Sequence, residues 1–422
     1  MERYSEYKDS GVQWLGEIPG HWGLIKMKYL FNERSEKNHP DEEPLCATQK
    51  YGVIPQKLYI SYGNRVVVVN KGFEQLKFVK VGDFVIHLRS FQGGIEYAYY
   101  QGISSAAYTI LYPKDEANTQ YFKHLFKSSK YIELLKTCVT GIREGQNINY
   151  PLLGTKQIPL PPLSEQHTIV SFLDDKCAKI DKMLEGKQKQ IELLAEMKQR
   201  IIADAVTRGL NPDDKMKATN IPWLPEIPEH WEMESLRRFL KIFAEKGHGD
   251  KQLLSVTREQ GVIERNTDSK EENHNFIPED LSGYKYVQVG DFVINKMKSW
   301  QGSYGVSEYE GIVSPAYFTC KLQGVDKDFF STAIRSKIYV SFFARYSKGI
   351  RVDQWDLSPI ALKSIPFALP PLDEQRAIVS YITDKTSKID TLTSKLQQEI
   401  ESIKEYKQRL ISDVVTGQIK VC

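Results

Sequence analysis

Two aligned loops, one in each half of the chain, carry side chains suited to contact with a nucleic acid. The first reads Arg89-Ser90-Phe91-Gln92-Gly93, and its counterpart reads Lys298-Ser299-Trp300-Gln301-Gly302. A cation can pair with a phosphate, an arginine can bind guanine through two hydrogen bonds, and a glutamine can bind adenine in the same way. The alternative is a turn whose aromatic residue, Phe91 or Trp300, fills the domain core. We favour that core role for the aromatic residues and a surface role for their polar neighbours.

A second pair of loops has the same character, at Gly141–Asn149 and at Gly349–Trp355. Each begins Gly-Ile-Arg, and Arg345 and Lys348 add positive charge beside the second. Such loops suit contacts with phosphates and base edges; alternatively, their arginines pair with an acid and fix the start of a helix. The candidate DNA-contacting residues are Arg89, Ser90, Gln92, Arg143, Gln146, Asn147, Lys296, Lys298, Trp300, Gln301, Lys348, Arg351 and Gln354.

Signatures of catalysis are missing from the sequence. There is no GxxxxGK[ST] phosphate loop, no GxGxxG after a strand, no HExxH and no GxSxG. A metal-binding role for His21 or His230 has no supporting ligand spacing. We therefore predict no catalytic residue, no metal site and a non-catalytic binding protein.

The amino-acid composition says less about the class of protein than the two pairs of loops do. The net charge of 422 residues is only +3, which is weak support for a polyanionic partner. The five cysteines form no CxxC pair, which favours a reducing compartment. The sequence shows neither a signal peptide nor an apolar run of membrane-spanning length. We expect a cytoplasmic protein.

The elements that must position the loops are themselves repeated. Residues Trp14–Trp22 read WLGEIPGHW and residues Trp223–Trp231 read WLPEIPEHW, an offset of 209 residues. The matches continue in order along the chain, so the sequence holds two copies of one domain. The segments Phe31–Val79 and Ile242–Val287 do not match convincingly. Either two recognition modules have different targets, or the copies drifted neutrally after duplication.

Each repeat begins with short β-type runs and ends in one long helix. After each proline pair, Ser164 and Asp373 are expected N-caps, and Gly209 and Gly417 are expected stops. Each helix would be about 60 Å long. A seven-residue apolar repeat predicts that the two helices form a coiled coil, which the chain connectivity favours as antiparallel. The heptad positions of the second helix are Ile382, Ile389, Leu396, Ile403 and Leu410.

The predicted fold class is α+β: two β-rich mixed α/β domains joined by two long antiparallel coiled-coil helices, with a pseudo-twofold internal repeat. The expected domains are residues 1–160 and 210–369, and the expected helical segments are 161–209 and 370–422.

The layout resembles the specificity subunit of type I restriction-modification systems. The resemblance rests on the paired WLxEIPxHW segments, the LPPLxEQ helix starts at Leu160–Gln166 and Leu369–Gln375, and the helix ends KQRIIADAVTRG and KQRLISDVVTGQ. It implies two target recognition domains, each reading half of an asymmetric bipartite DNA site, and a coiled coil that sets the gap.

The resemblance also implies partners. These are double-stranded DNA, two modification subunits that methylate adenine N6 with S-adenosylmethionine, and two motor-nuclease subunits for restriction. S-adenosylmethionine, ATP and magnesium are expected only on the partner subunits. The alternative is a coiled-coil scaffold with two protein-binding domains; a steep loss of affinity with salt would favour DNA.

Overall fold

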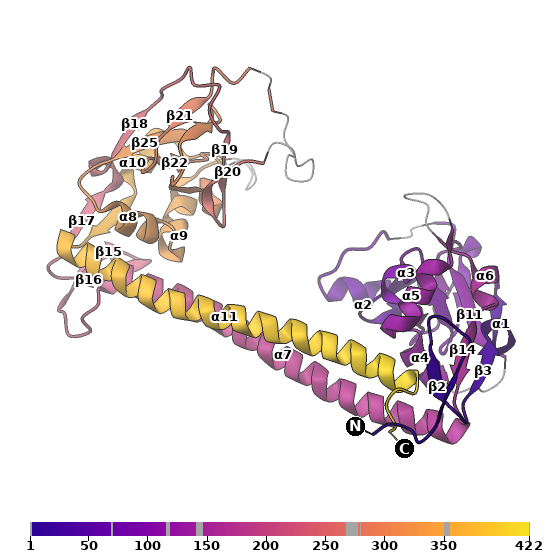
Figure 1. Ribbon diagram of the computed structural model, residues 1–422. Helices are drawn as coiled ribbons and strands as arrows, with labels where there is room; N and C mark the ends of the chain where they lie inside the picture. Colours follow the sequence, from indigo (N-terminus) through magenta and orange to yellow (C-terminus); the bar gives the residue numbers. More distant parts are fainter. Residues whose placement is uncertain are drawn as a thin grey trace. The chain divides into compact units, whose positions relative to one another are not determined.

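The structure, a computed structural model, describes residues 2–68, 71–114, 119–140, 147–266, 277–278, 280–349 and 355–421. The chain forms two compact units: Met1–Gln188 with Gln397–Cys422 (unit 1), and Lys189–Leu396 (unit 2). Each unit combines a globular part with stretches of both long helices, α7 (Leu163–Arg208) and α11 (Leu372–Val415) (Figure 1).

The globular part of unit 1 is built around the antiparallel sheet β4-β11-β8-β9. Leu111 lies opposite Phe84 in its central pair, and both side chains are buried. The elements of this part are β1 (Tyr7–Asp9), β2 (Glu17–Pro19), β3 (Gly23–Lys26), α1 (Met27–Leu30), β4 (Phe31–Arg34), β5 (Leu45–Thr48), β6 (Gly52–Pro55), α2 (Gln56–Ser61), η1 (Phe73–Gln75), β7 (Lys77–Val79), β8 (Phe84–Ile86), α3 (Ser90–Gly93), β9 (Glu96–Tyr97), β10 (Gly102–Ser104), β11 (Thr109–Pro113), α4 (Thr119–Leu125), α5 (Ser129–Thr137), β12 (Val139–Thr140), β13 (Asn147–Ile148), α6 (Tyr150–Gly154) and β14 (Gln157–Leu160).

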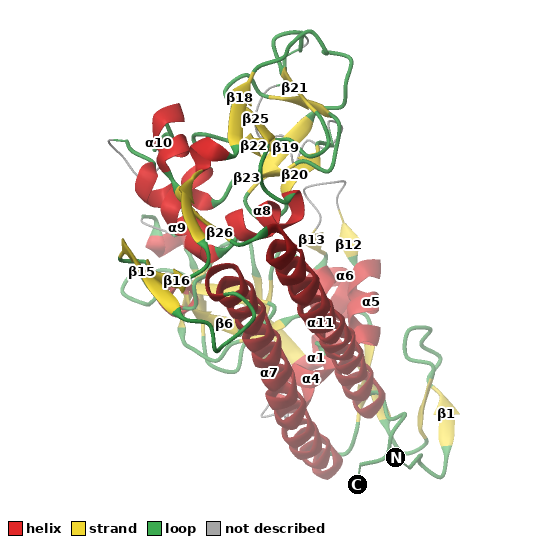
Figure 2. Ribbon diagram, turned by 90° about the vertical axis from the view of Figure 1, so that its left-hand side faces the viewer, coloured by secondary structure: helices red, strands yellow, loops and turns green. Residues whose placement is uncertain are grey.

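Unit 2 repeats this topology in its sheet β18-β25-β22-β23, seen in Figure 2. Cys320 lies opposite Phe292, as Leu111 lies opposite Phe84 in unit 1. The internal repeat is therefore confirmed in the strand order. The elements are β15 (Met216–Ile221), β16 (Leu224–Pro228), β17 (Glu232–Ser235), η3 (Leu236–Arg238), β18 (Leu240–Phe243), β19 (Leu254–Thr257), β20 (Gly261–Glu264), β21 (Lys285–Val287), β22 (Phe292–Ile294), η4 (Ser299–Gln301), β23 (Tyr304–Val306), β24 (Gly311–Val313), β25 (Phe318–Leu322), α8 (Lys327–Ile334), α9 (Lys337–Tyr346), α10 (Pro359–Ser364) and β26 (Pro366–Leu369).

Each unit has one main core, and the end of a long helix belongs to it. Trp22 in unit 1 and Trp231 in unit 2 are fully buried. Trp22 shares its core with Val414 of α11, and Trp231 shares its core with Val206 of α7. Because burial of a large aromatic side chain is worth roughly 2–3 kcal/mol, these tryptophans tie each helix end to its globular part.

The long helices begin and end close to the predicted positions. They begin one residue earlier than expected, at Leu163 and Leu372, so Ser164 and Asp373 lie inside the first turn and are not N-caps. Instead, the carbonyl of Pro162 accepts hydrogen bonds from the backbone N–H groups of the first turn. Gly209, at φ +73°, follows the end of α7, as predicted for a left-handed helix stop.

The antiparallel pairing of α7 and α11 is confirmed within each unit. In unit 1, Lys407 pairs with Asp181 at 2.6 Å and Lys187 pairs with Glu399 at 2.5 Å, so residue numbers rise on one helix as they fall on the other. In unit 2, Lys198 pairs with Asp390 at 2.6 Å. Exposed pairs of this kind contribute only about 0.2–1 kcal/mol each. The predicted heptad residues carry the seam, because Ile382, Ile389, Leu396 and Leu410 are all buried.

A buried histidine links the globular part of unit 1 to α7. The Nε2 atom of His124, on α4, lies 2.9 Å from an oxygen of Asp174 on α7. Burial lowers the pKa of His124 to about 4, assisted by the positive charge of Lys123 and opposed by Asp174. The unfolded chain, with a histidine pKa of about 6.5, therefore takes up the proton first as the pH falls.

We expect unit 1 to lose stability between about pH 6.5 and pH 4 because of this histidine, by up to about 3 kcal/mol. Replacing His124 with glutamine should remove this part of the pH dependence, whereas His167→Gln, at an exposed position on α7, should leave it unchanged. Hydrogen exchange of unit 1 amides at pH 7.5 and pH 5 measures the difference. Equal pH dependence in the wild type and His124→Gln would show that the histidine has no such role.

Candidate nucleic-acid interface

The first predicted loop of unit 1 follows strand β8 and is folded back by its own hydrogen bonds. Arg89 and Gln92 are exposed, as expected for a binding surface, and Phe91 packs against the core. Ser90 is fully buried, and its hydroxyl accepts a hydrogen bond from the backbone N–H of His87 at 2.9 Å. We therefore assign Ser90 a supporting role within the loop in place of the predicted DNA contact.

A buried ion pair holds the end of this loop. Glu96 is fully buried, and Lys127 Nζ donates to its Oε1 at 2.6 Å and to the carbonyl of Gly93 at 2.9 Å. The second carboxylate oxygen of Glu96 has no hydrogen-bond partner. Because the carboxylate of Glu96 has lost its water, this ion pair fixes geometry more surely than it adds stability, although Lys127 stays partly exposed.

The matching loop of unit 2 is a 3-10 turn where the loop of unit 1 is an α-helical turn, and it has a different support. Lys298 is exposed and Ser299 is fully buried, like Arg89 and Ser90. In place of a buried acid, the Arg335 guanidinium donates to the backbone carbonyls of Tyr304, at 2.6 Å, and Arg258, at 3.1 Å. Burial lowers the pKa of Arg335 from its ordinary value.

In unit 2 the structure brings both predicted loops together. Lys296 Nζ lies 3.0 Å from Asp356 Oδ2, and the backbone groups of Lys348 and Asp356 exchange two hydrogen bonds. The rings of Trp300 and Trp355 meet edge to face, 5.5 Å between centroids. Lys348 is exposed, whereas Lys296 and Trp300 are partly buried by these contacts.

The remaining predicted residues can be placed only in part. Arg143, Gln146, Arg351 and Gln354 lie outside the described residues. Asn147 is exposed on β13, the strand that pairs with β12 after helix α5. Since α5 packs on α3, this hairpin belongs to the same region of unit 1 as the first loop.

Sequence reasoning missed a hairpin turn that lies against each first loop. In unit 1, the Thr48 hydroxyl donates to the carbonyl of Gly52 at 3.0 Å and accepts from the N–H of Tyr51 at 3.0 Å. A side-chain carbon at Gly93 would come within 2.5 Å of Gln49, so the turn touches the loop. The exposed residues of the turn are Gln49 and Lys50.

Unit 2 contains the same turn with different side chains. The Thr257 hydroxyl donates to the carbonyl of Gly261 at 3.3 Å and accepts from the N–H of Gln260 at 3.1 Å. Its exposed residues are Arg258, Glu259 and Gln260. Arg335 joins this turn to the loop beside it through the carbonyls of Arg258 and Tyr304.

The two hairpins lie inside the segments that did not match in sequence. The conclusion that these two segments do not correspond is therefore wrong at the level of structure. A second shared feature supports this: His39 pairs with Glu36 at 2.8 Å, and His248 pairs with Glu245 at 3.0 Å. Each histidine also stacks on an aromatic ring of the neighbouring strand. Phe31–Val79 and Ile242–Val287 thus share one scaffold. The signals that could have revealed it are Glu-x-x-His and Thr-x-x-x-Gly at the common offset of 209 residues.

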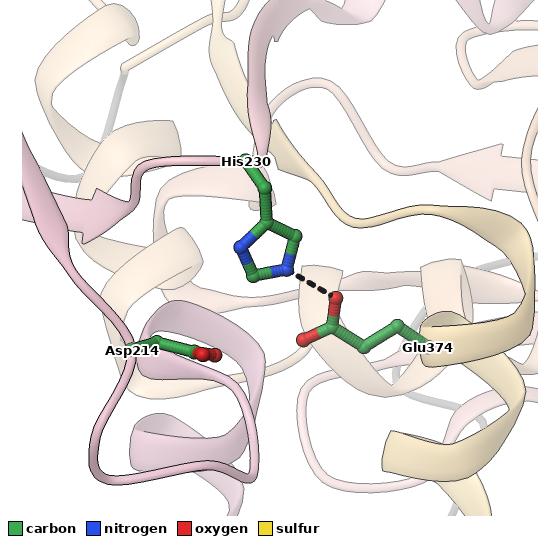
Figure 3. A group of neighbouring side chains, drawn as sticks. All are labelled: Asp214, His230 and Glu374. Carbon is green, nitrogen blue, oxygen red and sulfur yellow. Dashed lines mark hydrogen bonds and ion pairs between the residues drawn. The ribbon is translucent and has the colours of Figure 1, made fainter.

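A separate group of possible metal ligands lies in unit 2 (Figure 3). Asp214, His230 and Glu374 each place one ligand atom within 4.8 Å of the others. His230 and Glu374 are also hydrogen-bonded at 2.8 Å. This group has no local signal in the sequence, because its members come from three separate segments.

Comparison with known proteins shows which proteins the chain resembles. Residues 19–193 match the family described as the type I restriction modification DNA specificity domain. The type I restriction enzyme MjaVIII specificity subunit of Methanocaldococcus jannaschii is 25% identical over 451 residues, covering 100% of this chain and 98% of that protein. Residues 19–193 thus match the type I specificity domain, and the chain resembles type I specificity subunits over its whole length.

Two further comparisons point to the same family and fold. The type I restriction enzyme EcoKI specificity subunit of Escherichia coli is 23% identical over 338 residues, covering 74% of this chain and 68% of that protein. A solved chain, from work on complex assembly and conformational transition of the type I R-M system, has a TM-score of 0.63 at 14% identity. It covers 95% of this chain and 99% of that one, and it supports the fold. Among the described residues, no helix has the length and apolar character needed to cross a bilayer.

Proposed function

We propose that this specificity subunit reads two different half-sites of one asymmetric DNA sequence, one with each globular part. The proposed target recognition domains are residues 1–160 and 210–369, and the proposed spacer segments are 161–209 and 370–422. The paired helices fix the number of unread base pairs between the half-sites and dock the modification subunits.

The observation that carries the proposal is one scaffold presenting two sets of side chains. The turn Thr48–Gly52 displays Gln-Lys-Tyr, whereas the turn Thr257–Gly261 displays Arg-Glu-Gln. Arginine suits guanine and glutamine suits adenine in the major groove. A duplicated scaffold with different reading residues at equivalent positions favours an asymmetric target.

The exposed cations of the neighbouring loops suit the DNA backbone. Arg89, Lys298 and Lys348 can each approach a phosphate, which sets the register of the turns on the duplex. Lys296 and Trp300 support this surface through Asp356 and Trp355. The residues that remain proposed contacts are Gln92, Gln301, Asn147, Arg143, Gln146, Arg351 and Gln354.

The catalytic work is proposed to belong to partner subunits. Two modification subunits would supply adenine-N6 methylation with S-adenosylmethionine, and two motor-nuclease subunits would supply ATP- and magnesium-dependent restriction. The chain itself would contribute recognition and assembly, without a cofactor of its own.

Replacing Arg258 with alanine is expected to weaken recognition of one half-site by about 10- to 100-fold, because a bidentate arginine–guanine contact is worth about 1–3 kcal/mol. Gln49→Ala should instead relax the other half-site. Methylation mapping with the modification partner measures both. Arg237→Ala, at an exposed arginine of unit 2 outside this surface, is the matched control. If Arg258→Ala altered both half-sites equally or neither, the turn would not be the reading element.

A further inference from the structure

The linker after α7, the turn between β16 and β17, and the first turn of α11 meet at one point in unit 2. They contribute Asp214, His230 and Glu374, whose side chains converge in Figure 3. One ligand atom from each lies within 4.8 Å of the other two. A histidine nitrogen with two carboxylate oxygens is a set of ligands common in zinc sites.

The two repeats share a histidine–glutamate pair, but only unit 2 has an aspartate beside it. Unit 1 has the same histidine–glutamate pair, His21 with Glu165, at the same 2.8 Å. The backbone hydrogen bond from Glu229 to Lys215 in unit 2 matches that from Gly20 to Glu6 in unit 1. Asp214 therefore corresponds to Ser5. The pair alone joins each globular part to its helix start, and the third ligand is particular to unit 2.

The charges at this point are unbalanced. Among the described residues, no lysine or arginine lies within 4.0 Å of the carboxylates of Asp214 or Glu374. Two neighbouring carboxylates repel each other unless a cation lies between them. In the part of the chain that the structure describes, His230 is the basic residue paired with these acids, at 2.8 Å from Glu374.

Neighbouring groups already orient both carboxylates. The side-chain amide of Asn211 donates to Asp214 Oδ1 at 2.8 Å, and the indole N–H of Trp231 donates to Glu374 Oε2 at 3.0 Å. Outer hydrogen bonds of this kind fix the direction of ligands in metal sites. Asp214 can then bind a metal through Oδ2.

We propose that Asp214, His230 and Glu374 bind a divalent transition-metal ion of the zinc type. Tetrahedral ligands at about 2.0–2.2 Å from the metal lie about 3.4 Å from one another. The present separations reach that spacing by side-chain rotation, because His230 is exposed and the two acids are partly exposed. The imidazole disfavours calcium and magnesium, which prefer oxygen ligands.

The fourth position of such a site is open to water. His230 also lines a cleft of about 610 Å³ with Glu232, Leu369 and Gln375. The ion would cross-link the linker after α7, the turn after β16 and the first turn of α11. Its expected effect is therefore to stabilise unit 2 and to leave unit 1 unchanged. This inference does not depend on the proposed DNA-reading function.

The test is titration of the metal-free full chain with zinc in competition with a chromophoric chelator, followed by thermal unfolding. We expect one tightly bound ion and a rise in the melting temperature of unit 2 by about 5 °C at 100-fold excess over the dissociation constant. Asp214→Asn should weaken the tight site at least tenfold, with an unchanged metal-free melting temperature. Cobalt bound to the wild type should give a d–d absorption spectrum that this variant lacks.

The internal control is His21→Gln, which breaks the equivalent pair of unit 1 and should leave zinc affinity unchanged. Zinc held by scattered surface histidines would bind Asp214→Asn as tightly as the wild type. That result, or the absence of a tight site in the wild type, would overturn the proposal.

Discussion

Inserting one heptad into both long helices is expected to lengthen the unread gap of the DNA site by about three base pairs and to leave both half-sites unchanged. Seven residues add about 10 Å of helix, and one base pair occupies about 3.4 Å. The insertions belong at the level of the Lys187–Glu399 pair, so that the antiparallel register is kept on both sides. Methylation at the original sequence should be lost almost completely and reappear at sequences with the longer gap.

The control is the same heptad inserted into α7 alone. It shifts one helix against the other, separates partners such as Lys198 and Asp390, and should reduce methylation at every spacing. If the double insertion changed the half-site sequences, or kept methylation at the original gap, the helices would not set the spacing.

Replacing Gly94 with alanine is expected to destabilise unit 1 by roughly 3 kcal/mol or more and to abolish reading of its half-site. Gly94 has φ +86°, where an L side chain is strained, and an added Cβ would lie 2.2 Å from the carbonyl oxygen of Phe126. The clash is with backbone, so no rotamer relieves it, and the loop carrying Arg89 and Gln92 must move. The melting temperature of unit 1 should fall by about 10 °C.

Gly82→Ala is the matched control for this effect. Gly82 has a similar φ of +93°, but nothing lies within 4 Å of an added Cβ. It should cost only about 1 kcal/mol from strain and keep both half-sites. Equal losses in the two variants would show that strain, and not the contact with Phe126, is the cause.

The long helices were predictable because their signals are local. A proline pair, a seven-residue apolar repeat and a terminal glycine each act on neighbouring residues, and α7 and α11 begin within one residue of the expected caps. Their antiparallel direction was also predictable, because the connection through unit 2 favours it. What the sequence did not show is that the helix ends belong to the domain cores, as Val206 and Val414 do.

The reading surface was predictable by residue type but not by orientation. Arg89, Gln92 and Lys298 are exposed as expected, whereas Ser90 is turned inward by a hydrogen bond to His87. That inward turn depends on how the backbone folds back on itself, which residue type does not specify. The hairpin turns escaped notice because only Thr and Gly are kept in them, while the exposed residues between differ.

The group of Asp214, His230 and Glu374 in unit 2 could not have been found from the spacing of residues in the sequence. His230 and Glu374 are 144 residues apart, and their contact exists only because the turn after β16 lies beside the start of α11. Metal-site motifs in sequences are usually short because their ligands share one helix or loop. A site assembled from three segments has no such local signal.

The most direct test of an asymmetric, bipartite DNA target is single-molecule methylome sequencing of a strain that expresses this chain with its modification partner. We predict one bipartite motif with adenine methylation in two different half-sites, separated by a gap of fixed length. A palindromic motif, a single continuous motif, or no adenine motif would contradict the claim that the two repeats read different halves of one DNA site.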